Sequence, residues 1–479
     1  MAYQEFYVTQ GSLANKANGG YPNTAANDGP VVTRLVTVAA DGLTITATDT
    51  ANWTGAAIGD WVCVNDGTNY GLAKMTNIVG AAATVSPALP AALRSDIGDT
   101  AKVGGAWPDL GTAEALLDVI GATNWPASTD WPRVNVKIHG GNAYTTSNGG
   151  TWSASITWGT AWDTTATDKN LTIEGYVASP GDTSWRTSAN RAVLSCSISG
   201  SPAIHVNQTG IRWLNIKAIN SSIGASSHAW TLGSGVLTAT GGHWNCEAYA
   251  VNGSGFHTTN ATTHVGARLI RCFAHDCGVN GFTVPKQAQV LGCQSYTNAG
   301  KGFSFLEGGT LLDSLGYNNT GITVEYNISS AANGGVIRGN TLDGNGSAEG
   351  IYLKNGASGN GQLLALITID ANFITNFTTG LTANDTQNTL TTMYTRNVFY
   401  GNSTANVLAS HFWDGGGNVT GINPGYTNRT TRNYTPLPNS PGILRSGSTF
   451  LGYVGSQAPT LSGVSDNSAP SVPRRPGSL

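Results

Sequence analysis

The sequence predicts an all-β protein built as a parallel β-helix, a solenoid in which each turn of the chain stacks on the turn before it. Columns of small polar residues recur at intervals of a few dozen residues through the middle of the chain. The apolar runs between these columns are too short for helices, and Asn, Gly and Ser interrupt each of them. A unit of this kind cannot bury its apolar face alone, so it must stack on its neighbours.

Three columns keep in phase with one another. The first column is Asn215, Cys246, Cys272, Cys293, Ser314, Asn340, Asn372 and Asn397. The second, about five positions later, is Asn220, Asn252, Cys277, Asn298, Asn319, Asn345, Asn376 and Asn402. The third is a glycine before an apolar residue, at Gly255, Gly281, Gly302, Gly321, Gly350 and Gly380.

Stacked turns lie roughly 4.8 Å apart, the spacing of strands in a sheet. Asn side chains at that spacing can hydrogen-bond to one another along the stack, and Asn and Gly tolerate the left-handed backbone of tight corners. We therefore expect the first column to form a structural ladder inside the coil. The cysteines in it are interpreted as small packing residues.

Before the coil, the sequence predicts two other parts. Residues 1–30 are rich in Gly, Asn and Ala without periodicity and are expected to form an extended arm. Residues 31–104 show short alternating strands, such as those at 31–38 and 43–47, and predict a small separate β domain.

The coil is expected to fill residues 105–435. A helix over 110–122 at its start has an apolar stripe and ends at Gly121, which suggests a cap over the open end of the solenoid. Residues 436–479 are rich in Pro and Ser and have the composition of a disordered tail.

Composition limits the possible functions. Charged residues make up 11% of the chain and the net charge is −3, so the sequence gives no electrostatic case for nucleic-acid binding. The six cysteines form no CxxC or Cys/His metal pattern, so we expect no metal and no cofactor. No apolar run is long enough for a membrane span, and residues 1–5 show no secretory signal. A polysaccharide-degrading enzyme that a bacterium exports usually needs such a signal, whereas a protein released by cell lysis does not.

Two segments resemble a known superfamily. The segment 102–110, followed by 136–144, is similar to the entry of pectate-lyase-like, right-handed parallel β-helix proteins, and 418–428 with 433–443 resembles their exit segment. The resemblance implies a right-handed coil. It leaves function open, because the superfamily includes pectate lyases, polygalacturonases, phage tailspikes and non-catalytic virion proteins. Neither the paired-aspartate motif with Gly-His-Gly nor the Arg-x-Pro-x-x-Arg motif is present.

A column of charges follows the glycine column: Lys286, Glu307, Glu325, Lys354 and Asp385. Glu307 and Glu325 on adjacent turns would lie close enough for a glycosidase pair, and one carboxyl beside another has a raised pKa. The alternative is an exposed structural column that the two lysines neutralise. In the functional interpretation, Lys286, Lys354 and Asp385 are candidate saccharide-binding residues.

Other candidates have structural interpretations beside functional ones. His257 could be a base or an inert surface residue, and the cluster of His275, Asp276 and Cys277 could be a turn or a metal site. Seven tryptophans in the first turns could form a glycan platform or pack internally: Trp152, Trp158, Trp162, Trp185, Trp213, Trp230 and Trp244.

These features favour a non-catalytic virion structural protein of a tailed phage, either a capsid decoration or cement protein or a tail spike or fibre subunit. We expect a homo-oligomer, by analogy a trimer, with other virion proteins and a surface glycan as partners and no nucleic acid or membrane. The alternatives are a depolymerising polysaccharide lyase or hydrolase and a glycan-binding adhesin. The sequence leaves open capsid or tail placement, host, saccharide and stoichiometry.

Overall fold

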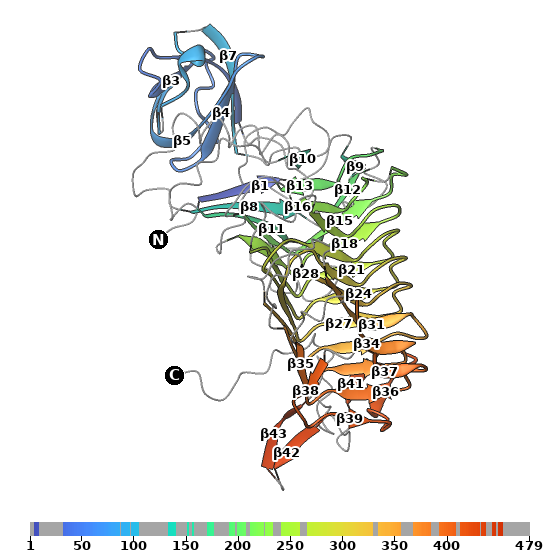
Figure 1. Cartoon of the computed structure of the whole chain (residues 1–479). Helices are drawn as coiled ribbons and strands as arrows, with labels where there is room; N and C mark the ends of the chain where they lie inside the picture. The colour runs from blue at the N-terminus through green and yellow to red at the C-terminus, as the bar shows by residue number, and fades with distance from the viewer. Residues whose placement is uncertain are drawn as a thin grey trace. The chain divides into compact units, whose positions relative to one another are not determined.

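A computed structural model of the chain confirms the predicted parallel β-helix (Figure 1). The structure describes residues 4–8, 32–86, 88–95, 97–104, 133–139, 151–152, 156–157, 170–176, 191–196, 199–206, 211–224, 226–232, 241–258, 266–328, 334–355, 367–384, 392–408, 412–431, 433–436, 443–446 and 449–453. The helix expected at 110–122 lies outside these residues.

Three long parallel sheets make the coil, and each full turn supplies one strand to each of them. The strands of the 12-stranded sheet are, in spatial order, β1 (Gln4–Val8), β8 (Arg133–His139), β11 (Asn170–Tyr176), β14 (Ile211–Leu214), β17 (Gly242–Trp244), β20 (Arg268–Ile270), β23 (Ala288–Leu291), β26 (Gly309–Leu312), β29 (Gly335–Arg338), β32 (Ile367–Asp370), β35 (Thr392–Thr395) and β38 (Phe412–Asp414). Those of the 11-stranded sheet are β9 (Thr151–Trp152), β12 (Ala192–Cys196), β15 (Ile216–Asn220), β18 (Glu247–Ala250), β21 (Phe273–His275), β24 (Gln294–Tyr296), β27 (Leu315–Tyr317), β30 (Thr341–Asp343), β33 (Phe373–Thr375), β36 (Val398–Tyr400) and β39 (Val419–Thr420). Those of the 10-stranded sheet are β10 (Ile156–Thr157), β13 (Ile204–Val206), β16 (Trp230–Leu232), β19 (Phe256–Thr258), β22 (Phe282–Val284), β25 (Phe303–Phe305), β28 (Val324–Ile328), β31 (Glu349–Asn355), β34 (Thr379–Asn384) and β37 (Ala405–Leu408).

The interior of the coil is filled by side chains that repeat from turn to turn. Strands have a period of two, so alternate residues of every strand point inward. In the 10-stranded sheet, four inward aromatic rings stack on successive turns: Trp230, Phe256, Phe282 and Phe303 have centroids 5.9, 5.0 and 5.1 Å apart. All four residues are fully buried, and the stack ties each turn to the next.

The first column of small residues lies at the corner between the 12-stranded and 11-stranded sheets. From Cys272 onward, each member's backbone N–H donates to the side chain of the next: Cys272 to Cys293 Sγ, Cys293 to Ser314 Oγ, Ser314 to Asn340 Oδ1, Asn340 to Asn372 Oδ1 and Asn372 to Asn397 Oδ1. Asn397 donates in the same way to Asn418, which the sequence interpretation left out of the column. We call the members of this column from Cys246 to Asn397, together with Asn418, the corner ladder.

Asn215 belongs to a different position of the corner. The residue directly before each ladder residue has a left-handed backbone, as at Asn245 (φ 52°), Arg271 (φ 54°) and Ala371 (φ 55°). Asn215 has φ 58° and so occupies this turn position, with Ile216 following it. Asn suits both positions, because its side chain stabilises the left-handed region and can also form ladders. The assignment of Asn215 to the first column was therefore wrong by one residue.

The second column also contains both ladder residues and left-handed turn residues. Asn298 donates from Nδ2 to Asn319 Oδ1 at 2.8 Å and accepts from the N–H of Cys277 at 3.0 Å, so these residues form a second buried ladder. Asn345 (φ 48°) and Asn376 (φ 59°) instead adopt the left-handed turn conformation.

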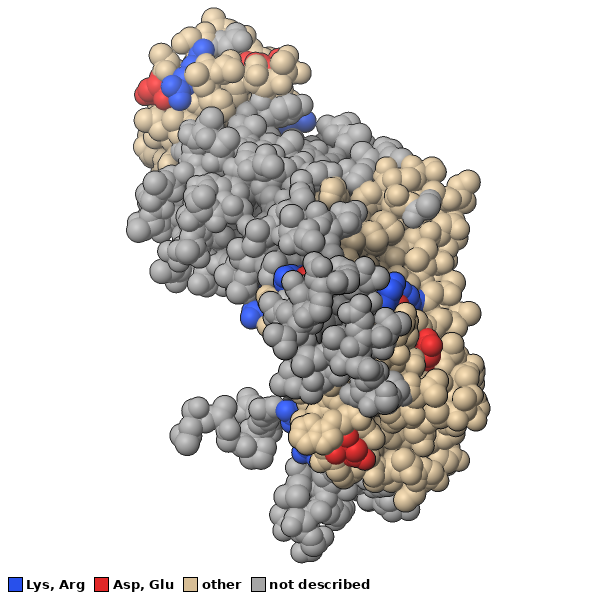
Figure 2. Space-filling model, viewed as in Figure 1, with Lys and Arg blue, Asp and Glu red and all other residues tan. Residues whose placement is uncertain are grey.

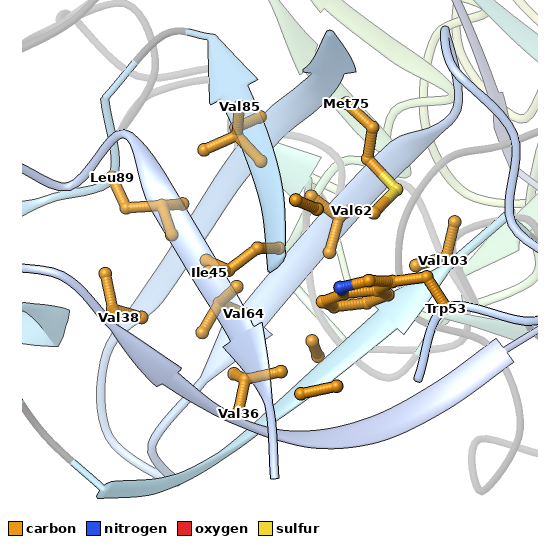
Figure 3. Close-up of a cluster of buried hydrophobic side chains, with 14 of the residues drawn as sticks. Val36, Val38, Ile45, Trp53, Val62, Val64, Met75, Val85, Leu89 and Val103 are labelled. Carbon is orange, nitrogen blue, oxygen red and sulfur yellow. The ribbon is translucent and has the colours of Figure 1, made fainter. Parts of the chain in front are cut away.

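Residues within 32–103 form a closed antiparallel barrel (Figure 3). In order around the barrel its strands are β2 (Val32–Val38), β3 (Thr44–Ala47), β6 (Ala82–Ser86), β5 (Tyr70–Val79), β4 (Trp61–Asn65) and β7 (Ile97–Val103), and a short 3-10 helix, η2 (Ala91–Leu93), precedes β7. Valine is the commonest residue of its core, and Trp53 donates from Nε1 to the carbonyl of Ala81 at 2.8 Å. Closure removes the exposed strand edges that otherwise promote aggregation.

Two terminal segments contain regular structure. In the segment expected to be an extended arm, β1 pairs in parallel with β8. In the segment expected to be a disordered tail, β42 (Ile443–Ser446) and β43 (Thr449–Tyr453) form an antiparallel hairpin. The intervening Gly447-Ser448 between two short segments with apolar residues favours such a hairpin, and overall composition hides this local signal.

A second hairpin, β40 (Tyr426–Asn428) with β41 (Asn433–Pro436), packs on the outer face of the 11-stranded sheet. Its anchor is Asp343, which is 1% exposed. Arg429 contacts both carboxylate oxygens, with Nε at 2.6 Å and Nη2 at 3.0 Å, and the Tyr434 hydroxyl donates to Oδ2 at 2.9 Å. We call residues 423–436 the C-terminal strap, because it fastens the last turns of the coil.

The corner ladder predicts unequal costs for two asparagine changes. Asn372→Gly removes two hydrogen bonds that the side chain accepts from Asn340 and two that it donates, to the carbonyl of Ile337 and to Asn397 Oδ1, all inside the coil. Leaving these buried groups unpaired should cost about 1–3 kcal/mol. Asn345→Gly is the matched control, because glycine suits its exposed left-handed position. Chemical denaturation measures the free energy of unfolding of both variants, and equal losses of stability would contradict the ladder's role.

Candidate functional site

The outer face of the 10-stranded sheet carries one continuous row of polar side chains. Strand register aligns its members, one on each turn: His205, Thr231, His257, Thr283, Ser304, Glu325, Tyr352 and Thr382. The inward neighbours of these residues are the core residues of each strand, so period-two alternation fixes the row on the outside. We call it the outer row.

Three charged groups gather where the outer row reaches β28. Lys301 Nζ lies 2.5 Å from Glu325 Oε1, and the Ser304 hydroxyl donates to the same oxygen at 3.5 Å. Glu349, at the start of β31, lies near enough to Glu325 to be affected by its charge. Burial, followed by repulsion from Glu325, raises the pKa of Glu349 above its ordinary value.

The expected pairing of Glu307 with Glu325 is wrong in register. β25 pairs with β28 so that Ser304 lies beside Glu325. Glu307 is three residues farther along, which is roughly 10 Å of strand. It forms its own ion pair with Lys286, with Nζ and Oε2 3.3 Å apart. Glu307 and Glu325 therefore belong to two separate lysine–glutamate pairs.

Lys354 is exposed on β31, where register places it between Asn327 and Asn384. Asp385 lies outside the described residues. The sequence interpretation missed Lys301 and Glu349, yet both had a signal, because each directly precedes a glycine of the third column.

A pair of imidazole rings occupies the N-terminal part of the same face. His228 and His257 stack with centroids 3.8 Å apart and planes 13° apart. Burial lowers the pKa of each ring to about 4. The N–H of Ser254 donates to His228 Nδ1 at 3.0 Å, which requires the neutral ring. Both rings are therefore neutral near pH 7.

This stack does not have the geometry of a metal site. Lone pairs of nearly parallel rings point in parallel directions and do not converge on one ion. Among the described residues, no group of three or more His, Cys, Asp or Glu side chains is placed to hold a metal. His257 Nδ1 and Thr231 Oγ1, on neighbouring strands, have no hydrogen-bond partner. Both atoms are buried, so a ligand on the surface of the sheet does not reach them.

The tryptophans that the structure describes do not form a glycan platform. Trp213 and Trp230 are fully buried in the coil interior, and Trp244 is partly buried on β17. Trp158, Trp162 and Trp185 lie outside the described residues, as does the side chain of Trp152. His275 and Asp276 lie instead on the outer face of the 11-stranded sheet, where they contact Glu247 and Thr297.

Charge is sparse over the described surface, as Figure 2 shows for one face. In the part of the chain that the structure describes, no helix is long and apolar enough to span a membrane.

No protein-family model and no curated protein matches the chain. Among solved structures, it is similar to the pectate lyase Pel9A, with 13% identity over 72% of this chain and 91% of that chain and a TM-score of 0.48. It is also similar to the tailspike protein gp49 from Pseudomonas phage LKA1, with 14% identity over 88% of this chain and 75% of that chain and a TM-score of 0.32. A third similar structure is the Gp54 tailspike of Acinetobacter baumannii bacteriophage AP22, with 10% identity over 86% of this chain and 74% of that chain and a TM-score of 0.32.

The histidine stack predicts acid sensitivity. An unfolded histidine has a pKa of about 6.5, whereas both rings titrate at about 4 in the fold. Between these values the unfolded chain binds more protons, so stability falls as the pH drops from about 6.5 towards 4. We expect His257→Gln to flatten the fall in melting temperature over this range.

Thr382→Ser, on the same outer row, serves as the control and should keep the full slope. An unchanged slope in His257→Gln would show that the stack does not carry the effect.

Proposed function

We propose that the chain is a virion structural protein of a tailed phage, a spike or fibre subunit that presents its 10-stranded sheet to a surface glycan. The observation that carries this proposal is the outer row. It sets hydroxyl, imidazole and carboxylate groups in one line, with one group on each turn. The partly exposed members His205, His257 and Tyr352 carry polar groups to which a polymer rich in hydroxyl groups can hydrogen-bond. The other five members are buried and support these groups from the adjoining turns.

The chain's composition supports the same proposal. Only 11% of residues are charged, and the abundant neutral hydrogen-bonding groups suit an uncharged or weakly charged saccharide. The resemblance of segments 102–144 and 418–443 to a superfamily that includes tailspikes and virion proteins points in this direction too. We propose a homotrimer that contacts other virion proteins, without a cofactor.

Location in a particle tests the proposal. We expect cryo-electron microscopy of purified phage to place the chain at the tail, and mass photometry of the purified protein to give three copies. Density at regular positions over the shell would instead identify a decoration protein. Absence from every particle would overturn the virion proposal.

A second candidate function, cleavage of the glycan, is favoured by the environment of Glu349. The raised pKa of Glu349 keeps its carboxyl protonated to higher pH, as a general acid requires. Glu325 beside it pairs with Lys301. In hydrolysis, Glu349 would protonate the glycosidic oxygen as the C–O bond breaks. Glu325 would take a proton from the attacking water.

If cleavage occurs, Glu349→Gln should lower its rate by about 10²–10⁴-fold because the general acid is lost. Reducing-end release from a panel of bacterial capsular and O-antigen polysaccharides measures this. Glu307→Gln is the matched control, since its ion pair with Lys286 lies apart from Glu349, and it should cleave normally. Equal rates in Glu349→Gln and the unmodified protein would exclude Glu349 as the general acid. No cleavage of any polysaccharide would exclude this function.

A further inference from the structure

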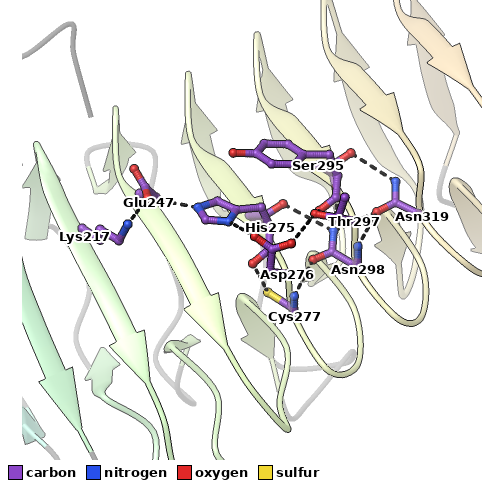
Figure 4. Close-up of polar contacts among 11 residues, drawn as sticks. Lys217, Glu247, His275, Asp276, Cys277, Ser295, Thr297, Asn298 and Asn319 are labelled. Atoms are coloured by element: carbon purple, nitrogen blue, oxygen red, sulfur yellow. Dashed lines mark hydrogen bonds and ion pairs between the residues drawn. The ribbon is translucent and has the colours of Figure 1, made fainter. Parts of the chain in front are cut away.

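A chain of polar contacts crosses successive turns on the outer face of the 11-stranded sheet (Figure 4). This sheet is different from the one that carries the outer row. Lys217 on β15 lies 2.5 Å from Glu247 Oε1 on β18. The same oxygen lies 3.0 Å from His275 Nε2 on β21. His275 Nδ1 lies 2.7 Å from Asp276 Oδ2, and the Thr297 hydroxyl donates to Asp276 Oδ1 at 2.6 Å. One imidazole therefore links groups from neighbouring turns.

Aromatic rings enclose the same imidazole. Tyr296 stacks on His275 with centroids 5.0 Å apart and planes 6° apart, and Tyr249 lies on the other side at 6.2 Å. The register pairs His275 with Tyr296, so the stack follows from the sheet itself. Electron-rich ring faces favour a cation between them.

The hydrogen bonds define the protonation state of His275. An ionised carboxylate only accepts, so a ring nitrogen that faces one must carry a hydrogen. Both nitrogens of His275 face carboxylates, and only the imidazolium ion donates from both. Burial of the ring acts against protonation, but the hydrogen bonds and charges of Glu247 and Asp276 outweigh it and raise the pKa of His275 above its usual value.

We propose that His275 is a proton-operated clamp, which fastens the β18, β21 and β24 turns to one another while its ring is charged and loosens them when the ring loses its proton. The groups facing the ring are Glu247 from the preceding turn, Asp276 beside it, and Tyr249 and Tyr296 on either side. Lys217, one turn farther back, pairs with Glu247. Deprotonation leaves one carboxylate facing a nitrogen that no longer donates. The clamp does not depend on a glycan or on the proposed virion role.

The sign of the effect follows from linkage. The folded pKa of His275 lies above its unfolded value of about 6.5. The clamp's contribution to stability is therefore complete below pH 6.5 and is lost as the pH rises through the folded pKa. This is the reverse of the His228–His257 stack.

Hydrogen exchange of the full chain across pH, read by mass spectrometry, tests the clamp. After correction for intrinsic exchange, we expect protection of 247–250, 273–275 and 294–296 to fall as the pH rises through the folded pKa of His275. The fall should be on the order of tenfold for each unit by which that pKa is raised. Strands β30 and β33 should show no such step. His275→Gln should abolish the step, whereas His205→Gln, on the 10-stranded sheet, should keep it.

A step that persists in His275→Gln would overturn the proposal. If that variant fails to fold, the histidine ring resonances of the unmodified protein decide the matter by nuclear magnetic resonance. Titration of His275 above pH 6.5 supports the clamp, and titration at or below 6.5 overturns it.

Discussion

Hydrogen bonding between successive turns at the coil's corners is the constraint on which the rest of the structure depends. A turn offers its backbone N–H and C=O groups to the turns on either side, and buried groups of this kind must be paired. Pairing continues past the corner only if the chain bends identically each time. A left-handed residue followed by a small ladder residue provides that bend, as at Ala371-Asn372 and Arg396-Asn397. Once the corners coincide, the strands between them are in register without further specification.

Register then determines how charges can be arranged. A side chain on one strand has its nearest outward neighbours on the adjoining turns, so charged residues pair across turns. Lys301 with Glu325 and Lys217 with Glu247 are examples, each joining residues more than twenty positions apart. A coil with few charges can therefore hold each of these carboxylates beside a cation. The candidate site and the proposed clamp are two such places, on different sheets.

The sequence predicted the coil because its columns of small residues mark the corners of successive turns. It could not separate ladder from turn positions, since Asn suits both, and this shifted Asn215 by one residue. It also paired Glu307 with Glu325 although they are 18 positions apart, whereas the turn there spans 21 and brings Ser304 to Glu325. The contact of Arg429 with Asp343, 86 residues apart, depends on how the strap lies over the sheet, and no local pattern encodes it.

The histidines show how register gives one residue type opposite roles. At the His228–His257 stack each ring meets another ring and buried surface, so the neutral form is favoured and acid weakens the fold. At His275 the same sheet spacing brings carboxylates and phenol rings to the imidazole, so the charged form is favoured and base weakens the fold. The two contributions overlap fully only near the ordinary histidine pKa of about 6.5. Together, the proposed clamp at His275 and the His228–His257 stack therefore stabilise the coil most at mildly acidic to neutral pH.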